Sequence, residues 1–119
     1  YNYNVRETNG LLKIPGKSIN LFLRDKTGKA IGGIFCATYC DTLYIDNFWI
    51  DEEYRGSGHG KALIIQAEGI ASNMGCKLSH TSTFSYQSPE FYKKMGYEVF
   101  GVIDEYPDGM VQYFLKKRL

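Results

Sequence analysis

The stretch FWIDEEYRGSGHGKAL, residues 48–63, joins a strand-like segment to a helix-like segment through a glycine-rich loop. Residues 43–50 are rich in aromatic and β-branched side chains, which favours a strand. After the loop, apolar residues recur at spacings of 4, 3 and 4, which predicts one apolar face of a helix. These residues are Leu63, Ala67, Ile70 and Met74, and Gly75 is placed to end the helix.

The loop over residues 55–61 has the composition of an anion-binding site. The N-terminus of a helix leaves backbone N–H groups unpaired and carries partial positive charge, so it attracts phosphate. The glycines of the loop allow an anion to approach the backbone without interference from a Cβ atom. Arg55 and Lys61 either add positive charge to the site or point to solvent.

Two common nucleotide-binding motifs do not fit this loop. The P-loop pattern ends in Lys followed by Ser or Thr, but here Ala62 follows Lys61, and the first glycine of that pattern is also missing. The dinucleotide pattern G-x-G-x-x-G requires glycine where Lys61 or Leu63 stands. The pattern that fits is R-x-x-G-x-G, which residues 55–60 carry.

The rest of the chain divides into short elements separated by turn residues. Gly32 and Gly33 lie inside a strand-like run and mark either a bulge or a close backbone approach. Ser88 followed by Pro89 favours the start of a short helix. The element order predicts a mixed α/β sheet. We expect strands at residues 19–24, 30–39, 43–50, 76–84, 97–103 and 110–115, with helices after residues 58 and 88.

Length and charge restrict the function. The 119 residues predict a single domain over residues 1–119, in which residues 1–18 are poorly defined. The formal net charge of +1 argues against a dedicated nucleic-acid binder. The only basic cluster, residues 116–118, is interpreted as a solvated tail.

The cysteines and the hydropathy pattern indicate a cytoplasmic protein. An odd count of three cysteines does not predict a disulfide framework, and the spacing does not fit a zinc site. We expect Cys36, Cys40 and Cys76 to be reduced thiols in the core, and we expect no metal. No apolar run approaches the roughly 18 residues of a membrane span.

Three segments together resemble the GNAT superfamily of N-acetyltransferases. They are the R-x-x-G-x-G loop, the preceding strand and acidic turn FWIDEEY at residues 48–54, and FYKKMGY at residues 91–97, which is similar to the family's F-Y-x-x-x-G-[FY] segment. The resemblance covers residues 19–119. It implies a mostly antiparallel central sheet with a splayed parallel strand pair, flanked by helices. The N-terminal elements of the family would then be short or missing.

The resemblance also implies a binding site for acetyl-CoA. Pantetheine would lie between Phe48, Trp49 and Ile50 on one strand and residues 78–83 on the next. The pyrophosphate would accept hydrogen bonds from the N–H groups of Gly56, Ser57, Gly58, His59, Gly60 and Lys61, with Arg55 beside them. Gln87 stands where the family often has an Asn near the cofactor.

Three residues are candidates for the chemistry. Tyr92 matches the family's general acid, and the reference pKa values of a phenol and a thiol are close enough for proton donation to be nearly balanced. Asp46 interrupts an apolar strand, where burial would make a carboxylate a better base toward the amine; a structural role is equally compatible. His80 either faces the acceptor site or is a core residue.

The implied activity is direct acetyl transfer from acetyl-CoA to a primary amine of a small molecule or protein. The alternatives are a non-catalytic acyl-CoA-binding module and an interaction domain with an incidental glycine-rich loop. Acidic residues near the loop and near residues 104–108 either attract a cationic acceptor or are solvated turns. Because residues 1–18 are too short for the family's usual N-terminal elements, we expect an open cleft or one completed by a homodimer partner.

Overall fold

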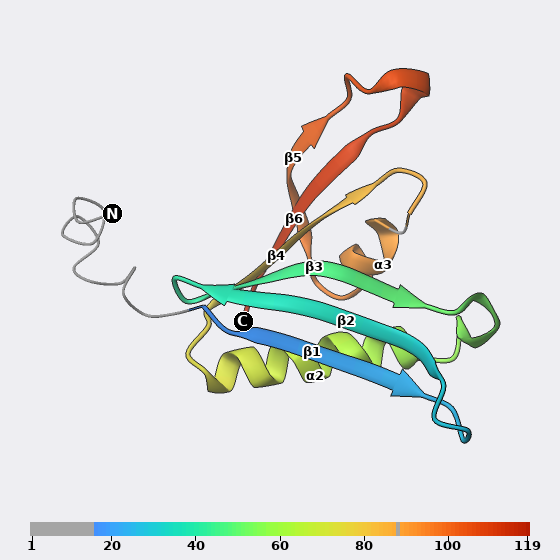
Figure 1. The fold of residues 1–119 in the computed structure, drawn as a ribbon. Helices are drawn as coiled ribbons and strands as arrows, with labels where there is room; N and C mark the ends of the chain where they lie inside the picture. The colour runs from blue at the N-terminus through green and yellow to red at the C-terminus, as the bar shows by residue number, and fades with distance from the viewer. Residues whose placement is uncertain (1–15, 88) are drawn as a thin grey trace.

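The computed structural model describes residues 16–87 and 89–119, which form one six-stranded mixed sheet and two α-helices (Figure 1). The strand order is β1-β2-β3-β4-β6-β5, and only the β3–β4 pair is parallel. This arrangement confirms the expected mixed α/β fold. The elements are β1 (Ser18–Arg24), β2 (Ala30–Tyr39), β3 (Thr42–Ile50), the 3-10 turn η2 (Glu52–Tyr54), α2 (His59–Asn73), β4 (Leu78–Phe84), α3 (Pro89–Lys94), β5 (Glu98–Ile103), the 3-10 turn η3 (Pro107–Gly109) and β6 (Gln112–Arg118).

The β1–β2–β3 meander forms one half of the sheet, and α2 runs along it (Figure 1). A Cβ atom on Gly32 would lie 2.7 Å from Cδ1 of Ile50, and one on Gly33 would lie 3.1 Å from the indole nitrogen of Trp49. The two glycines therefore mark a close approach between β2 and β3, and the bulge of this pair lies elsewhere.

Helix α2 packs its buried face against the meander. The buried residues are Leu63, Ile64, Ala67, Glu68 and Ala71. The predicted face was partly wrong, because Met74 is exposed at 41 %. Gly75 ends the helix as expected: its φ is 94°, and the N–H of Cys76 donates to the carbonyl of Ala71 at 2.9 Å.

The second half of the sheet depends on a parallel pairing that stops early. Residues 42–45 of β3 pair with residues 78–81 of β4, and neither strand continues the ladder beyond that point. The hydroxyl of Thr81 donates to the carbonyl of Ile45 at 2.9 Å, at the last paired position. From there β3 and β4 diverge, with α3 beside the opening (Figure 1).

Strand β6 corrects the interpretation of the basic C-terminal cluster. Residues 116–118 were expected to be a solvated tail, but they are part of β6 and pair with β4. Lys117 lies on the same face of β6 as the buried Leu115 and points toward α2, where its Nζ lies 2.9 Å from Oε1 of Glu68. A long-range partner that the local sequence does not reveal therefore makes this lysine part of the packed structure.

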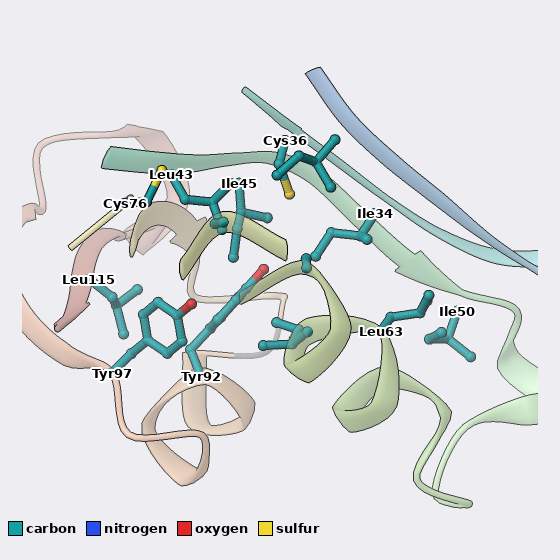
Figure 2. Packing of buried hydrophobic residues seen from close by; sticks show 14 residues of the cluster. Ile34, Cys36, Leu43, Ile45, Ile50, Leu63, Cys76, Tyr92, Tyr97 and Leu115 are labelled. Atoms are coloured by element: carbon teal, nitrogen blue, oxygen red, sulfur yellow. The ribbon is translucent and has the colours of Figure 1, made fainter. Parts of the chain in front are cut away.

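A polar network joins α2, β4 and β6 inside the core. The hydroxyl of Tyr97 donates to Oε2 of Glu68 at 2.8 Å and lies 2.7 Å from the hydroxyl of Ser79. Figure 2 shows Tyr97 and Tyr92 side by side, with both hydroxyl groups directed toward the strands. Every buried polar side-chain atom among the described residues has a hydrogen-bond partner, so the network can be accommodated in the core.

We expect Glu68→Ala to lower the free energy of unfolding by about 3 kcal/mol, because it removes the acceptor of a largely buried ammonium group and of a buried phenol. The measurement is urea unfolding. The matched control is Glu90→Ala, which removes an exposed pair with Lys93 whose side chains are 74 % and 46 % exposed; here we expect less than about 1 kcal/mol. Equal losses in the two variants contradict a structural role of the network.

Cys36 and Cys76 are buried, but Cys40 lies in the β2–β3 turn and is only half-buried; all three are free thiols. The helix start predicted at Ser88 falls on a residue outside the described ranges. Among residues 16–87 and 89–119, no helix has the length and apolar character of a membrane span.

Candidate active site

A cleft of about 670 Å³ occupies the opening where β3 and β4 diverge. Its lining residues come from β3, the 55–61 loop, the end of β4, the turn after β4, and α3. They are Ile45, Asp46, Asn47, Phe48, Trp49, Ile50, Tyr54, Arg55, Gly56, Gly58, Gly60, Lys61, Thr81, Ser82, Thr83, Tyr86, Gln87, Phe91 and Tyr92. The early end of the parallel pairing therefore creates the site.

A β-bulge in β3 shapes one wall of the cleft. Ile45 pairs with Cys36 and Asn47 pairs with Phe35, so Asp46 is an extra residue without a partner on β2. Its side chain is exposed to the cleft. The expectation of a buried acid was wrong, because the bulge turns this residue outward while Ile45 and Ile50 remain in the core.

The glycine-rich loop presents the start of α2 to the cleft. Gly56 and Gly58 have φ angles of 80° and 86°, which are easily reached only by glycine. Gly58 is the N-cap, and no side chain caps the helix. A Cβ atom on either glycine would meet nothing within 4 Å. The first N–H groups of α2 are therefore accessible beside an open space, as an anion site requires.

Arg55 and Gly60 have roles that the sequence did not indicate. Nε of Arg55 donates to the carbonyl of Ile50 at 2.8 Å, which fixes its guanidinium beside the loop. A Cβ atom on Gly60 would lie only 3.0 Å from Phe48 and 3.4 Å from Phe91. The rings of Phe48 and Phe91 stack at 5.4 Å, so Gly60 makes room for an aromatic contact between β3 and α3.

Tyr92 lies at the inner end of the cleft, where β3 and β4 separate. Its side chain is buried, and burial raises the pKa of Tyr92 to about 12. The expectation that the pKa of this phenol lies close to the pKa of a thiol is therefore wrong. At neutral pH Tyr92 is a protonated hydrogen-bond donor, suited to stabilising negative charge on a nearby sulfur.

Gln87 is oriented by the turn that follows β4. Its Oε1 accepts the backbone N–H of Phe84 at 2.8 Å and the hydroxyl of Thr83 at 3.1 Å. A backbone N–H can only donate, so the oxygen of the amide must face the turn. The Nε2 group is left to donate into the cleft.

Most of the predicted site residues meet at this cleft. The lining leaves out Ser57, and also His59, which packs beside Tyr54 with 6.3 Å between ring centroids. His80 is outside the cleft as well: its ring lies 5.1 Å from that of Tyr44, and burial lowers the pKa of His80. The proposed facing strand, residues 78–83, is only partly right, because its first part pairs with β3.

Sequence reasoning gave no separate role to several residues of the cleft, among them Thr81, Phe91 and Tyr86, and named Thr81 only within the facing strand 78–83. Thr81 is part of a row of buried hydroxyl residues on β4, a face that is usually apolar in a packed strand. Phe91 was quoted only as part of a motif, and Tyr86 was not noticed. The signal available for Thr81 was the recurrence of Ser or Thr at every second position, 79, 81 and 83.

The arrangement suits transfer of a group carried by a phosphate-containing molecule. A helix N-terminus is open at one end of the cleft, and a protonated phenol lies at the inner end. No cluster of three or more potential metal ligands occurs among residues 16–87 and 89–119.

Known proteins with related sequences and structures agree with this description. Residues 17–99 match the family described as acetyltransferase (GNAT) domain. A blasticidin-S acetyltransferase of Streptomyces morookaense is 36 % identical over 93 residues, which cover 77 % of this chain and 68 % of that protein.

Two solved structures share the fold. An acetyltransferase of Bacillus cereus is 38 % identical, with a TM-score of 0.87, and the match covers 99 % of this chain and 87 % of that one. A Bacillus anthracis protein solved in complex with acetyl coenzyme A is 22 % identical, with a TM-score of 0.77, and the match covers 93 % and 67 % of the two chains. By its sequence match and its architecture, the chain belongs to the GNAT family and is an acetyltransferase.

Proposed function

We propose that the cleft between β3 and β4 binds acetyl-CoA and transfers its acetyl group to the primary amine of a cationic small molecule. The observation that carries this proposal is the position of Tyr92 at the point where the strands diverge, with the open start of α2 lining the same cleft. The pyrophosphate binds the N–H groups of the 55–61 loop, and Arg55 adds positive charge. Pantetheine runs along residues 48–50 toward Tyr92.

Direct attack by the amine fits the groups that line the cleft. The neutral amine nitrogen adds to the thioester carbonyl, the C–S bond breaks, and the sulfur leaves as a thiolate that Tyr92 stabilises. The proton that the nitrogen loses as the amide forms passes to this sulfur through water, which gives the free thiol of CoA. A covalent route through Cys36 is disfavoured, because burial and the nearby Asp46 carboxylate raise the pKa of this thiol to about 12. Cys36 therefore stays protonated and weakly nucleophilic.

Asp46 is the proposed base. An alkyl amine has a pKa of about 10.4 and must lose a proton before it attacks. Asp46 is exposed at the cleft wall rather than buried, so it acts through water or by attracting the protonated amine.

Gln87 is proposed to donate Nε2 to acetyl-CoA. We expect Gln87→Glu to weaken acetyl-CoA binding about 10-fold, because the variant keeps an oxygen for the turn but loses the donor and gains a negative charge. Isothermal titration measures the affinity. Gln87→Ala loses the turn contacts as well, so only this second variant is expected to lower the melting temperature. Unchanged affinity in Gln87→Glu contradicts the contact.

The experiment that tests the proposed function is amine-dependent release of CoA. Blasticidin S is the first acceptor to try, because a relative is named for its acetylation, followed by polyamines, aminoglycosides and a lysine peptide. A thermal-shift titration with acetyl-CoA reports binding separately from turnover. If acetyl-CoA clearly raises the melting temperature but no CoA is released with any of these amines, the proposal of a small cationic acceptor is contradicted.

A homodimer that walls the acceptor side remains a prediction, which light scattering at high protein concentration tests.

A further inference from the structure

The cleft is lined from both faces of the sheet. On β4, Thr81 and Thr83 are buried toward the helices, so the alternating Ser82 and Phe84 point to the opposite face. On β3, Phe48 packs with α3, whereas Trp49 lies over Gly33 on the opposite face. The phosphate loop therefore lines the cleft on the helix side, and Trp49 and Ser82 line it on the open face.

Three aromatic rings lie in contact beside the cleft, and we call Phe84, Tyr86 and Tyr106 the aromatic wall. Tyr86 lines the cleft and is 72 % exposed. It stacks on Phe84 with 5.8 Å between centroids and 10° between the ring planes. Tyr106 meets Phe84 edge-on at 5.5 Å. One ring face of Tyr86 is thus covered, and most of the ring is open to solvent.

Hydrogen bonds fix the two segments that carry the aromatic wall. The N–H of Ser85 donates to the carbonyl of Val111 at 2.7 Å, and the N–H of Val111 donates to the Ser85 hydroxyl at 3.1 Å. The hydroxyl of Tyr106 donates to Oε1 of Gln112 at 2.8 Å. The turn after β4 is therefore held to the β5–β6 connection by hydrogen bonds. The exposed ring of Tyr86 lies on this fixed turn.

The phosphate loop lines the helix side of the cleft, which leaves the open face, beside the aromatic wall, for the acceptor. The nearly parallel pair formed by Phe84 and Tyr86 is the start of a stack that a flat ring extends. Exposed carboxylates at Asp104, Glu105 and Asp108 flank Tyr106 on the same connection and favour a positively charged molecule.

Resting on the proposed function, we propose that the aromatic wall receives the acceptor and that the acceptor is an amine carrying a flat conjugated ring, which stacks on Tyr86. Tyr86 is in this view a specificity-determining residue, and Phe84 and Tyr106 position it.

The test compares two primary amines of similar size, benzylamine and cyclohexylmethylamine, of which only the first has a flat ring. Wild type is expected to favour benzylamine in kcat/KM by roughly 2- to 12-fold, the range that aromatic stacking supplies. Tyr86→Leu is expected to abolish the preference and Tyr86→Phe to keep it. In all variants the KM for acetyl-CoA is expected to be unchanged. Tyr39→Leu, at an exposed tyrosine outside the cleft, is the matched control and keeps the preference.

Two results overturn the inference. One is equal kcat/KM for the two amines in wild type. The other is a change in the KM for acetyl-CoA in Tyr86→Leu with the preference between the amines unchanged. Failure of the proposed function has a different signature, namely no amine-dependent CoA release by wild type. In that case the preference is read from binding of the same two amines to the enzyme saturated with CoA, by saturation-transfer NMR. No ring-dependent binding there also overturns the inference.

Discussion

Gly58→Val is expected to weaken acetyl-CoA binding by at least about 100-fold. Gly58 is the N-cap of α2, its φ is 86°, and nothing lies within 4 Å of the position of a Cβ atom. A branched side chain would occupy that space and push the backbone out of the left-handed region. Both effects remove hydrogen bonds from N–H groups to a charged ligand, each contributing roughly 1.5–3 kcal/mol. Isothermal titration with acetyl-CoA measures the loss.

Gly28→Val separates backbone strain from lost binding. Gly28 has a φ of 88° and open space around its Cβ position, but it lies in the β1–β2 turn, away from the cleft. We expect the two variants to lose similar stability, while Gly28→Val keeps the wild-type affinity for acetyl-CoA. Wild-type affinity in Gly58→Val would exclude the start of α2 as the pyrophosphate site.

Tyr92→Phe is expected to lower kcat by about 100-fold and to leave the KM for acetyl-CoA nearly unchanged. The phenol donates to the sulfur only as negative charge develops there, so its loss affects the transition state more than binding. Because the pKa of Tyr92 is raised to about 12, the donor stays protonated below that pH. Any fall in rate between pH 8 and 10 therefore arises from another group, and we expect it to persist in the variant.

Tyr97→Phe is the matched control for Tyr92→Phe. The two rings are in contact, with centroids 5.5 Å apart, but the hydroxyl of Tyr97 is bonded within the core and does not line the cleft. We expect Tyr97→Phe to lower stability by roughly 1–3 kcal/mol and to keep kcat near wild type. If the two variants lose kcat equally, Tyr92 acts through packing and not as a donor.

The order of the elements could be predicted from local signals. Gly28 lies in a hairpin turn, and Gly75 and Gly96 end helices. All three have positive φ, a conformation that few other residues adopt, so the sequence marks each of these turns. The phosphate loop could also be predicted, because its glycines precede a helix. Their spacing excludes the two common nucleotide motifs and fits R-x-x-G-x-G. The resemblance then placed Tyr92 and residues 48–50 on a common cleft, which the geometry brings together.

What could not be predicted depends on non-local contacts. The bulge adds Asp46 to β3 relative to β2, and nothing near Asp46 in the sequence marks it, so its exposure was misjudged. Lys117 was taken as solvated because its partner, Glu68, is on α2. The acidity of Tyr92 was misjudged because it depends on burial, which a motif does not report.

The position of β6 has a consequence for how the molecule assembles. β6 follows β4 and β5 in the chain but lies between them in the sheet. Until residue 118 has been synthesised, one edge of β4 has no neighbour and β5 has nothing to pair with. A nascent chain that stops short of β6 therefore exposes an unsatisfied strand edge in the middle of the protein, which is a template for aggregation. Chaperone demand should therefore be greatest just before this strand emerges.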